Sequence, residues 1–208
     1  QDLSAIFKTN LKTGDRRLVY KHDTVDIGAV LVDEEGAVFG TTLMDGYLSW
    51  VFFKVENKEK DRIKEIGAKF PGSNISILSI SDKEDKMTFT VSSDINPGIH
   101  FLFDLNSAEL TPLGKFWGSI DESKLSYMEP ISFNAQDGTT IHGYLTKSAK
   151  GNSRNSPTIV HPHGGPEARD RWGFSPRVQM LASEGFNVLQ INFRGSSGYG
   201  KSHQRFIY

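Results

Sequence analysis

Residues 158–166 of this 208-residue chain read Thr-Ile-Val-His-Pro-His-Gly-Gly-Pro. The first three residues are β-branched, and the run is too short for a helix but suits a buried strand. Further along, Ser175 and Pro176 match a helix N-cap followed by proline at the first helical position, and Gly185 suits the residue after the helix. Residues 186–193 form the next apolar run. Strand, loop, helix and strand in this order predict a mostly parallel α/β sheet.

Two glycine-containing segments, residues 161–166 and 192–200, follow these two predicted strands. Open α/β sheets bind their ligands just past the carboxyl ends of their strands. Gly164 and Gly165 lack Cβ atoms, so their backbone can approach a substrate and point an N–H at an oxygen that becomes negative during acyl transfer. A tight turn that needs positive φ, without any catalytic part, explains the two glycines equally well.

Other ligand chemistries fit these segments less well. His161 and His163 form an H-x-H pair, but their side chains should point to opposite faces of an extended strand end, and no third ligand follows at metal-binding spacing. Residues 195–200 have the spacing G-x-x-G-x-G, which matches neither the dinucleotide fingerprint nor the P-loop. We therefore expect no metal and no cofactor, and histidines that are structural or orient a loop.

Residues 5–116 differ from the C-terminal part, because they consist of short apolar or alternating runs separated by turn residues, with no helix-length periodicity. Short strands at such spacing predict an all-β sandwich, barrel or propeller. One strand-and-turn pattern recurs at residues 6–14, 52–58 and 102–107. The separation in sequence between one repeat and the next is near the ~40–50 residues of a four-stranded propeller blade.

The recurrence favours a propeller. We interpret about residues 25–67 and 73–114 as two full blades, preceded by the last strands of another. A propeller blade buries its faces only against neighbouring blades, and two to three blades cannot close a ring. We therefore expect these residues to be the end of a longer array of blades. The sequence begins at Gln1 without an initiator Met, which agrees with that expectation. A β-sandwich whose hairpins resemble each other by chance is the alternative.

The composition is typical of a globular protein, with 37% hydrophobic and 24% charged residues and a formal net charge of −1. No apolar run approaches the ~20 residues of a membrane helix, so we expect no membrane partner. Residues 1–128 are acidic on balance, and the basic residues of 129–208 are scattered, which argues against nucleic acid as a partner. The chain has no cysteine, which excludes thiolate chemistry but leaves both cytoplasm and periplasm open.

Five segments of the C-terminal part occur in a distinctive order. They are His-Gly-Gly-Pro (163–166), Trp-Gly-Phe (172–174), Gln-Met-Leu-Ala (179–182), Gly-Phe-Asn-Val-Leu (185–189) and Asn-Phe-Arg-Gly-Ser-Ser-Gly-Tyr-Gly (192–200). Together they resemble the start of the catalytic domain in the prolyl oligopeptidase family, especially its acylaminoacyl-peptidase-like serine peptidases. The resemblance implies a multi-domain β plus α/β protein. Residues 1–120 would be the C-terminal blades of a β-propeller, and residues 121–208 the N-terminal portion of an α/β-hydrolase domain, truncated before the nucleophile.

The resemblance also implies roles for individual residues. The backbone N–H of Gly165 would contribute to the oxyanion hole, in a loop shaped by His163, Gly164 and Pro166. A buttressing turn beside the substrate cleft would contain Arg194, Gly195, Ser196 and Tyr199. For Arg194 we favour a structural role, because a guanidinium at a strand end often ties loop carbonyls or a carboxylate in place.

The family's nucleophile motif, G-x-S-x-G followed by Asp and His, is missing from the 208 residues, and His203 comes too early in chain order to be the base. We therefore expect an internal piece of a serine-type peptidase, gated by the propeller and inactive alone, with its triad beyond residue 208. Its partner would be a short or N-acylated peptide, and exposed strand edges make a homo-oligomer an option. A catalytically dead binding or scaffold protein is the alternative, and an esterase or lipase is a third option that the blades disfavour.

Overall fold

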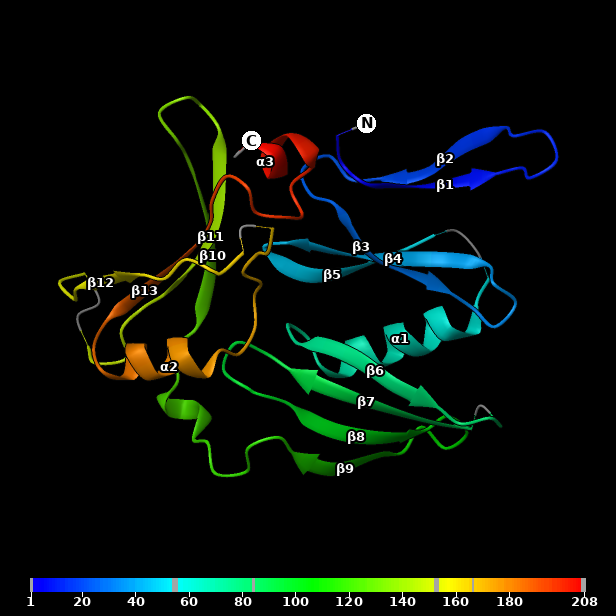
Figure 1. The fold of residues 1–208 in the computed structure, drawn as a ribbon. Coiled ribbons are helices and arrows are strands. Elements are labelled where there is room, and N and C mark those ends of the chain that lie inside the picture. Colours follow the sequence, from blue (N-terminus) through cyan, green and yellow to red (C-terminus); the bar gives the residue numbers. More distant parts are fainter. Residues whose placement is uncertain (1, 54–55, 84, 152–153, 166, 207–208) are drawn as a thin grey trace.

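The computed structural model describes residues 2–53, 56–83, 85–151, 154–165 and 167–206. Within these ranges the strands form four separate sheets, and none of the four closes into a barrel (Figure 1). The chain thus combines several antiparallel sheets with an α/β unit, which agrees with the coarse fold class predicted from the sequence. Assignment of the first sheets to propeller blades remains a prediction.

The first two sheets are built from strands that are consecutive in sequence and antiparallel. They contain β1 (Ala5–Thr9) with β2 (Arg16–Lys21), and β3 (Ile27–Val32) with β4 (Val38–Asp45) and β5 (Tyr47–Phe52). Gly46 has a φ of +74° in the turn between β4 and β5. A Cβ atom at this position would lie 3.1 Å from the Cβ of Pro130, so the tip of the hairpin closely approaches the C-terminal part of the molecule.

The third sheet contains β6 (Asn74–Ile80), β7 (Lys86–Ser92), β8 (Ile99–Asp104) and β9 (Leu110–Lys115), again consecutive and antiparallel. Along β7, Met87, Phe89 and Val91 are buried while the residues between them are not, which is the alternation of a strand with one face on a core. Phe89 stacks on Phe101 with ring centroids 5.7 Å apart. An apolar core thus holds this sheet together.

A helix, α1 (Lys58–Lys69), precedes β6 and corrects the prediction that residues 5–116 contain no helix. Only Ile63 and Ile66 are buried on it, so its apolar stripe is too narrow to stand out among the surrounding charged residues. Asn57 is the N-cap of this helix, and its side chain accepts a hydrogen bond from the backbone N–H of Lys60 at 2.9 Å.

This helix also removes one of the three predicted repeats. In the stretch 52–58, β5 ends at Phe52 and α1 begins at Lys58, so its described residues differ from a strand followed by a turn, and residues 54–55 lie outside the described ranges. The other two repeats do have a strand followed by a turn, at the ends of β1 and β8.

The fourth sheet has the order β10-β11-β13-β12. Its strands are β10 (Met128–Asn134), β11 (Thr140–Thr146), β12 (Thr158–Val160) and β13 (Asn187–Asn192), and its part of the chain also contains the short helices η1 (Glu122–Lys124), α2 (Pro176–Ser183) and α3 (Lys201–Arg205). β12 and β13 are parallel, with α2 between them in sequence, so the predicted strand, helix and strand are confirmed. The prediction of a mostly parallel sheet is wrong for the described strands, because β10 pairs with β11 and β11 with β13 in antiparallel fashion. The prediction that residues 158–160 form a buried strand is also wrong, because β12 lies at the edge of the sheet and Val160 is 57% exposed. The side chain of Ser175 caps α2, as expected, by accepting from the N–H of Val178 at 3.4 Å.

The β4–β5 hairpin docks on the fourth sheet. The hydroxyl of Tyr144 donates to the carbonyl of Gly46 at 2.8 Å, and the ring of Tyr47 lies edge-on to Trp172 with centroids 5.3 Å apart. Met44 packs against the buried cluster that contains Tyr144 and Trp172. Burial of Tyr144 raises the pKa of its phenol to about 12, so the hydroxyl stays a donor at neutral pH.

The first residues of the chain contact α3, as Figure 1 shows near the top of the molecule. The carboxylate of Asp2 accepts from the backbone N–H of Ser202 at 2.6 Å and from its hydroxyl at 2.7 Å. These hydrogen bonds lower the pKa of Asp2. Asp26 makes a second link, because its carboxylate accepts from the N–H of Gly200 at 3.1 Å.

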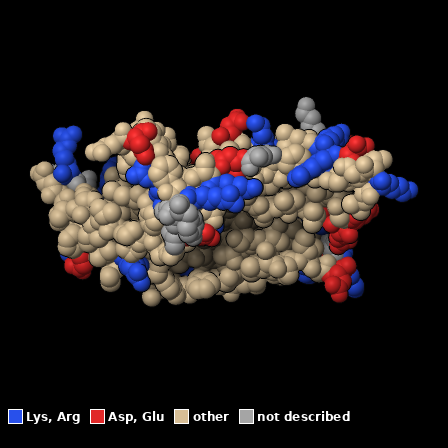
Figure 2. All heavy atoms as spheres, turned by 45° about the horizontal axis from the view of Figure 1, so that its top comes forward, with Lys and Arg blue, Asp and Glu red and all other residues tan. Residues whose placement is uncertain are grey.

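Figure 2 brings the top of Figure 1 forward and shows side chains of both charge signs interspersed around a hollow lined mainly by uncharged residues. None of the helices in the described ranges has the length and apolar character needed to cross a bilayer.

Candidate active site

The two glycine-containing segments leave the fourth sheet side by side. β12 and β13 are parallel neighbours with Ile159 opposite Val188, and the backbone N–H of His161 extends the pairing by donating to Leu189 at 2.8 Å. The segments that follow, residues 161–165 and 193–200, therefore start at the same sheet edge. The carboxyl ends of parallel strands are where open α/β sheets place their ligands.

Gly165 adopts a conformation that only glycine tolerates. Its φ is +149°, and a Cβ atom would lie 2.9 Å from the backbone nitrogen of Glu167 and 3.1 Å from that of Ala168. The residue is exposed, and no acceptor in the described part of the chain binds its backbone N–H. The loop thus presents a free N–H donor at the sheet edge.

His163 fixes the direction of that donor. Its Nδ1 lies 2.9 Å from the carbonyl oxygen of Gly164, and because a carbonyl only accepts, the proton is on Nδ1. The carbonyl of Gly164 and the N–H of Gly165 belong to one trans peptide unit, so they point in opposite directions. Holding the carbonyl with His163 therefore orients the N–H of Gly165 away from the ring.

The other ring nitrogen of His163 is held by the neighbouring turn. Nε2 lies 2.7 Å from Oγ of Ser196, which is completely buried. Since Nδ1 carries the proton, Nε2 accepts and the hydroxyl of Ser196 donates. The ring also stacks on Phe193, with centroids 4.5 Å apart and an interplanar angle of 14°. Both segments thus form one unit through His163.

The turn that carries Ser196 is tied down at several backbone positions. Gly195, with a φ of +99°, donates its N–H to the carbonyl of His203 at 2.9 Å. The N–H of Ser197 donates to the carbonyl of Ala168 at 3.0 Å. The turn is therefore connected both to α3 and to the chain that follows the Gly165 loop.

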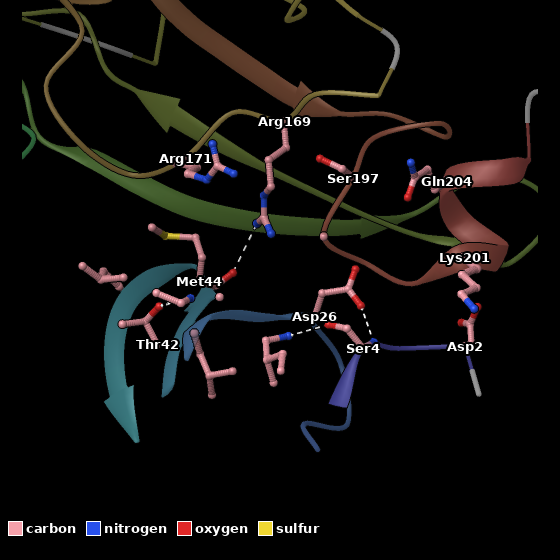
Figure 3. Close-up of a pocket in the computed structure, with 16 residues that line it drawn as sticks. Asp2, Ser4, Asp26, Thr42, Met44, Arg169, Arg171, Ser197, Lys201 and Gln204 are labelled. Atoms are coloured by element: carbon pink, nitrogen blue, oxygen red, sulfur yellow. Dashed lines mark hydrogen bonds between the residues drawn. The ribbon is translucent and has the colours of Figure 1, made fainter. Parts of the chain in front are cut away.

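A cavity of about 610 Å³ lies between this region and the strands β3 and β4 (Figure 3). Asp2, Asp26, Thr42 and Met44 line it from the N-terminal part of the chain, and Arg169, Arg171, Ser197, Gly198, Lys201 and Gln204 line it from the C-terminal part. Its walls carry both carboxylates and cationic groups.

Comparison with known proteins shows what the chain is similar to. Residues 172–208 match the sequence model of the prolyl oligopeptidase family. Over 97% of its length, the chain is 26% identical to dipeptidyl aminopeptidase BIII of Pseudoxanthomonas mexicana. Over 44% of its length, it is 42% identical to acylamino-acid-releasing enzyme 1 of Oryza sativa subsp. japonica. These matches confirm the resemblance to the prolyl oligopeptidase family that the sequence motifs predicted. The relatives are peptidases, and the family is one of serine peptidases.

A solved structure supports the same fold. A puromycin-hydrolyzing peptidase of Mycobacterium tuberculosis superimposes with a TM-score of 0.66 at 14% identity, over 99% of this chain and 32% of that one. The chain spans 30% of the length of the Pseudoxanthomonas enzyme and 12% of the length of the Oryza enzyme.

The structure brings together most of the residues named from the sequence. His163, Gly164, Gly165 and Ser196 lie together, whereas Pro166 lies outside the described residues. Arg194 instead forms an ion pair with Asp137 at 2.6 Å, with both side chains more than one-third exposed. Its guanidinium carbon also lies 5.1 Å from the ring centroid of Phe206. These contacts agree with the structural role favoured for Arg194.

Sequence reasoning missed a polar cluster that connects Asp170, Gln190, Asn192 and Tyr199. Asn192, which is fully buried, accepts from the N–H of Asp170 at 2.7 Å and donates to the hydroxyl of Tyr199 at 2.9 Å. Gln190 donates to the carboxylate of Asp170 at 2.8 Å. The only available signal was a pair of amides, Gln190 and Asn192, in a strand that was expected to be buried.

His161, the first histidine of the H-x-H pair, does not join this cluster. Nδ1 of His161 is buried and has no hydrogen-bond partner among the described residues. Among the described residues, no three His, Cys, Asp or Glu side chains are arranged to hold a metal ion.

Proposed function

We propose that this chain contributes part of the active site of a serine-type peptidase that cleaves short or N-acylated peptides by acyl transfer. The observation that supports this most directly is the exposed N–H of Gly165, which has no acceptor among the described residues and lies at the carboxyl end of β12. A preorganised backbone donor of this kind stabilises the negative oxygen of a tetrahedral intermediate.

The triad is assigned to sequence beyond residue 208, because these residues contain no G-x-S-x-G segment. In the proposed reaction, the Ser oxygen attacks the scissile carbonyl while His takes its proton, and His then gives that proton to the leaving amine. The carbonyl oxygen becomes the oxyanion and accepts from the N–H of Gly165. His163 contributes by holding the other side of the same peptide unit through the carbonyl of Gly164.

We further propose that residues 1–120 are the C-terminal blades of a propeller and residues 121–208 the start of an α/β-hydrolase domain. The sheets β3–β5 and β6–β9 support this, because each is a set of consecutive antiparallel strands, as in propeller blades. A cavity lined by residues of β3, β4 and the 197–204 segment also supports this proposal, because it lies between the strand-rich part and the segment that follows β13. In this arrangement the propeller limits access to short peptides.

The test is to express the protein from the complete gene and measure hydrolysis of aminoacyl and N-acetyl-aminoacyl p-nitroanilides. Gly165→Ala should lower kcat by about 100-fold, because the Cβ forces the peptide unit out of position, and loss of one oxyanion donor costs about 100- to 1000-fold. Gly164→Ala is the matched comparison: its Cβ would meet no atom within 4 Å, so its effect should be far smaller. Equal effects of the two variants would remove Gly165 from the oxyanion hole.

The second candidate is a binding or scaffold protein with the same architecture and no triad. The absence of a G-x-S-x-G segment from these 208 residues is the observation that favours this second candidate. A complete protein that binds acylated peptides without hydrolysing them would establish it. In either case, the 208-residue chain alone should show no hydrolysis.

A further inference from the structure

Arg169 bridges the strand-rich part of the molecule and the candidate active site. Its Nη2 donates to the backbone carbonyl of Met44 in the β4–β5 hairpin at 3.2 Å and to the hydroxyl of Tyr199 at 2.6 Å. Figure 3 shows the guanidinium pointing down from the loop toward Met44 across the cavity. One nitrogen thus contacts both the docked hairpin and the turn beside the Gly165 loop.

Both the hydroxyl and the ring of Tyr199 are held by contacts with neighbouring side chains. Its hydroxyl accepts from Arg169 and from Asn192, and its ring stacks on His142 with centroids 4.7 Å apart and an interplanar angle of 6°. The guanidinium carbon of Arg169 lies 4.2 Å from the centre of the same ring. Burial raises the pKa of Tyr199, so the phenol is neutral when it accepts these hydrogen bonds.

The backbone beside Arg169 is shaped to admit the guanidinium. Gly198 has a φ of +89°, and an added Cβ would clash with Nη1 of Arg169 and lie 3.0 Å from its Cδ. Any other residue at 198 would push the arginine out of its position over Tyr199. The glycine is therefore required by the close approach of the arginine as well as by its own conformation.

A continuous set of contacts leads from this arginine to the free N–H of Gly165. The turn that contains Tyr199 also contains Ser196, whose hydroxyl donates to His163 at 2.7 Å. His163 in turn holds the carbonyl of Gly164 at 2.9 Å and so orients the peptide unit that carries the Gly165 N–H. Displacement of the turn would release His163 from Ser196.

We propose that Arg169 is a positioning residue, which couples docking of the β4–β5 hairpin to the orientation of the Gly165 N–H. The inference rests on the proposed function of that N–H in acyl transfer. The strand-rich part would then influence the rate of acyl transfer through the guanidinium of Arg169, in addition to any effect on the access of substrate to the site.

Kinetics of the protein from the complete gene test this. Arg169→Met keeps side-chain length but removes both donations, and it should lower kcat by about 10- to 100-fold with KM changed by less than about 3-fold, since a misplaced donor acts on the transition state. Arg169→Lys, whose single nitrogen can donate to both acceptors, should restore kcat to within about 3-fold. Arg177→Gln, an exposed change on α2, should alter neither constant. Equal kcat in the Met and wild-type proteins would overturn the proposal.

A double-mutant cycle separates coupling from a general structural effect. Tyr199→Phe removes the shared hydroxyl, so the fall in kcat for the Arg169→Met and Tyr199→Phe double variant should be smaller than the product of the two single effects. Multiplicative effects would show that the two residues act independently and would refute the coupling.

A second measurement remains decisive if the complete protein hydrolyses nothing and the proposed function fails. In NMR spectra of the 208-residue chain, Arg169→Met should shift the imidazole signals of His163 and the amide signal of Gly165. The amide of Phe89 in the core of the third sheet should stay in place. Unchanged His163 and Gly165 signals would exclude the coupling whatever the activity.

Discussion

The third sheet and the fourth sheet are stabilised in different ways. Phe89 and Phe103 of the third sheet are almost completely buried in an apolar core. The fourth sheet buries polar side chains, those of Thr146, Gln190 and Asn192, beside apolar ones such as Ile141 and Val188. Apolar burial stabilises a fold without demanding one geometry, whereas a buried amide must meet its partners in a defined direction. The apolar core of the strand-rich part thus contributes mainly to stability, whereas the buried amides of the α/β part also fix the positions of the groups that they bind.

The largest effect on stability should come from the apolar core. Phe89→Ala should lower the free energy of unfolding by about 3–5 kcal/mol, because it removes a fully buried ring and leaves a cavity. Phe133→Ala, which truncates a ring that is 44% exposed, should cost much less. Urea denaturation of the 208-residue chain measures both. Similar losses for the two variants would contradict the assignment of the core.

A polar substitution in the fourth sheet should cost less stability but disturb the loops more. Asn192→Ala leaves the N–H of Asp170 without its partner and should cost about 1–3 kcal/mol. It should also increase amide hydrogen exchange at Ser196 and Ser197, which Phe89→Ala should not do below the unfolding transition. The exposed variant Asn155→Ala serves as control. If exchange at Ser196 is unaffected, the amide does not position the turn.

A smaller effect should come from the contact between the two parts. Tyr144→Phe removes the hydrogen bond to the carbonyl of Gly46 and should cost about 1 kcal/mol near neutral pH. Tyr127→Phe, at a side chain that is 68% exposed, should cost nothing measurable.

Tyr144 also predicts a pH dependence. Its pKa of about 12 in the folded chain exceeds the ordinary value of 10.0, so the unfolded state loses its proton first, and stability falls as pH rises from 10 toward 12. The Phe variant should lack this part of the alkaline loss, which denaturation at a series of pH values will reveal.

The smallest effect should come from the exposed ion pair of Arg194 and Asp137. The pKa of Asp137 in the folded chain is lowered from the ordinary value of 3.8, mainly because its carboxylate accepts from the backbone N–H of Thr139. Its contribution to stability is therefore present above pH 3.8 and is lost as the pH falls through the lowered pKa of the folded chain. Asp137→Asn should therefore flatten the acid limb of the stability curve while changing kcat little. A large change in kcat would give Arg194 a role beyond the one proposed for it.

The sequence predicted those features that depend on neighbours along the chain. The run at residues 158–160, the cap at Ser175 and the turn at Gly138 each have a local cause, and each is found in the structure. Helix α1 was missed because two buried isoleucines are a weak pattern in a charged segment.

The candidate site was predictable only in part. Gly164 and Gly165 stand out because glycine has a specific backbone role, but Arg169 gives no such signal in one sequence. Its partner Met44 is 125 positions away, and no spacing rule connects a guanidinium with a distant backbone carbonyl. Polar networks of this kind are visible only once the fold has brought their members together.

The hydrogen bonds between Asp2 and Ser202 join residues that are 200 positions apart. A ribosome adds roughly 5–20 residues per second, so Asp2 is synthesised on the order of 10–40 s before Ser202. During that interval the strands β1 and β2 can pair with each other, but their attachment to α3 must wait. In the cell, that attachment therefore forms only after residue 202 has been made, and a chaperone that binds β1 and β2 has time to act before it forms.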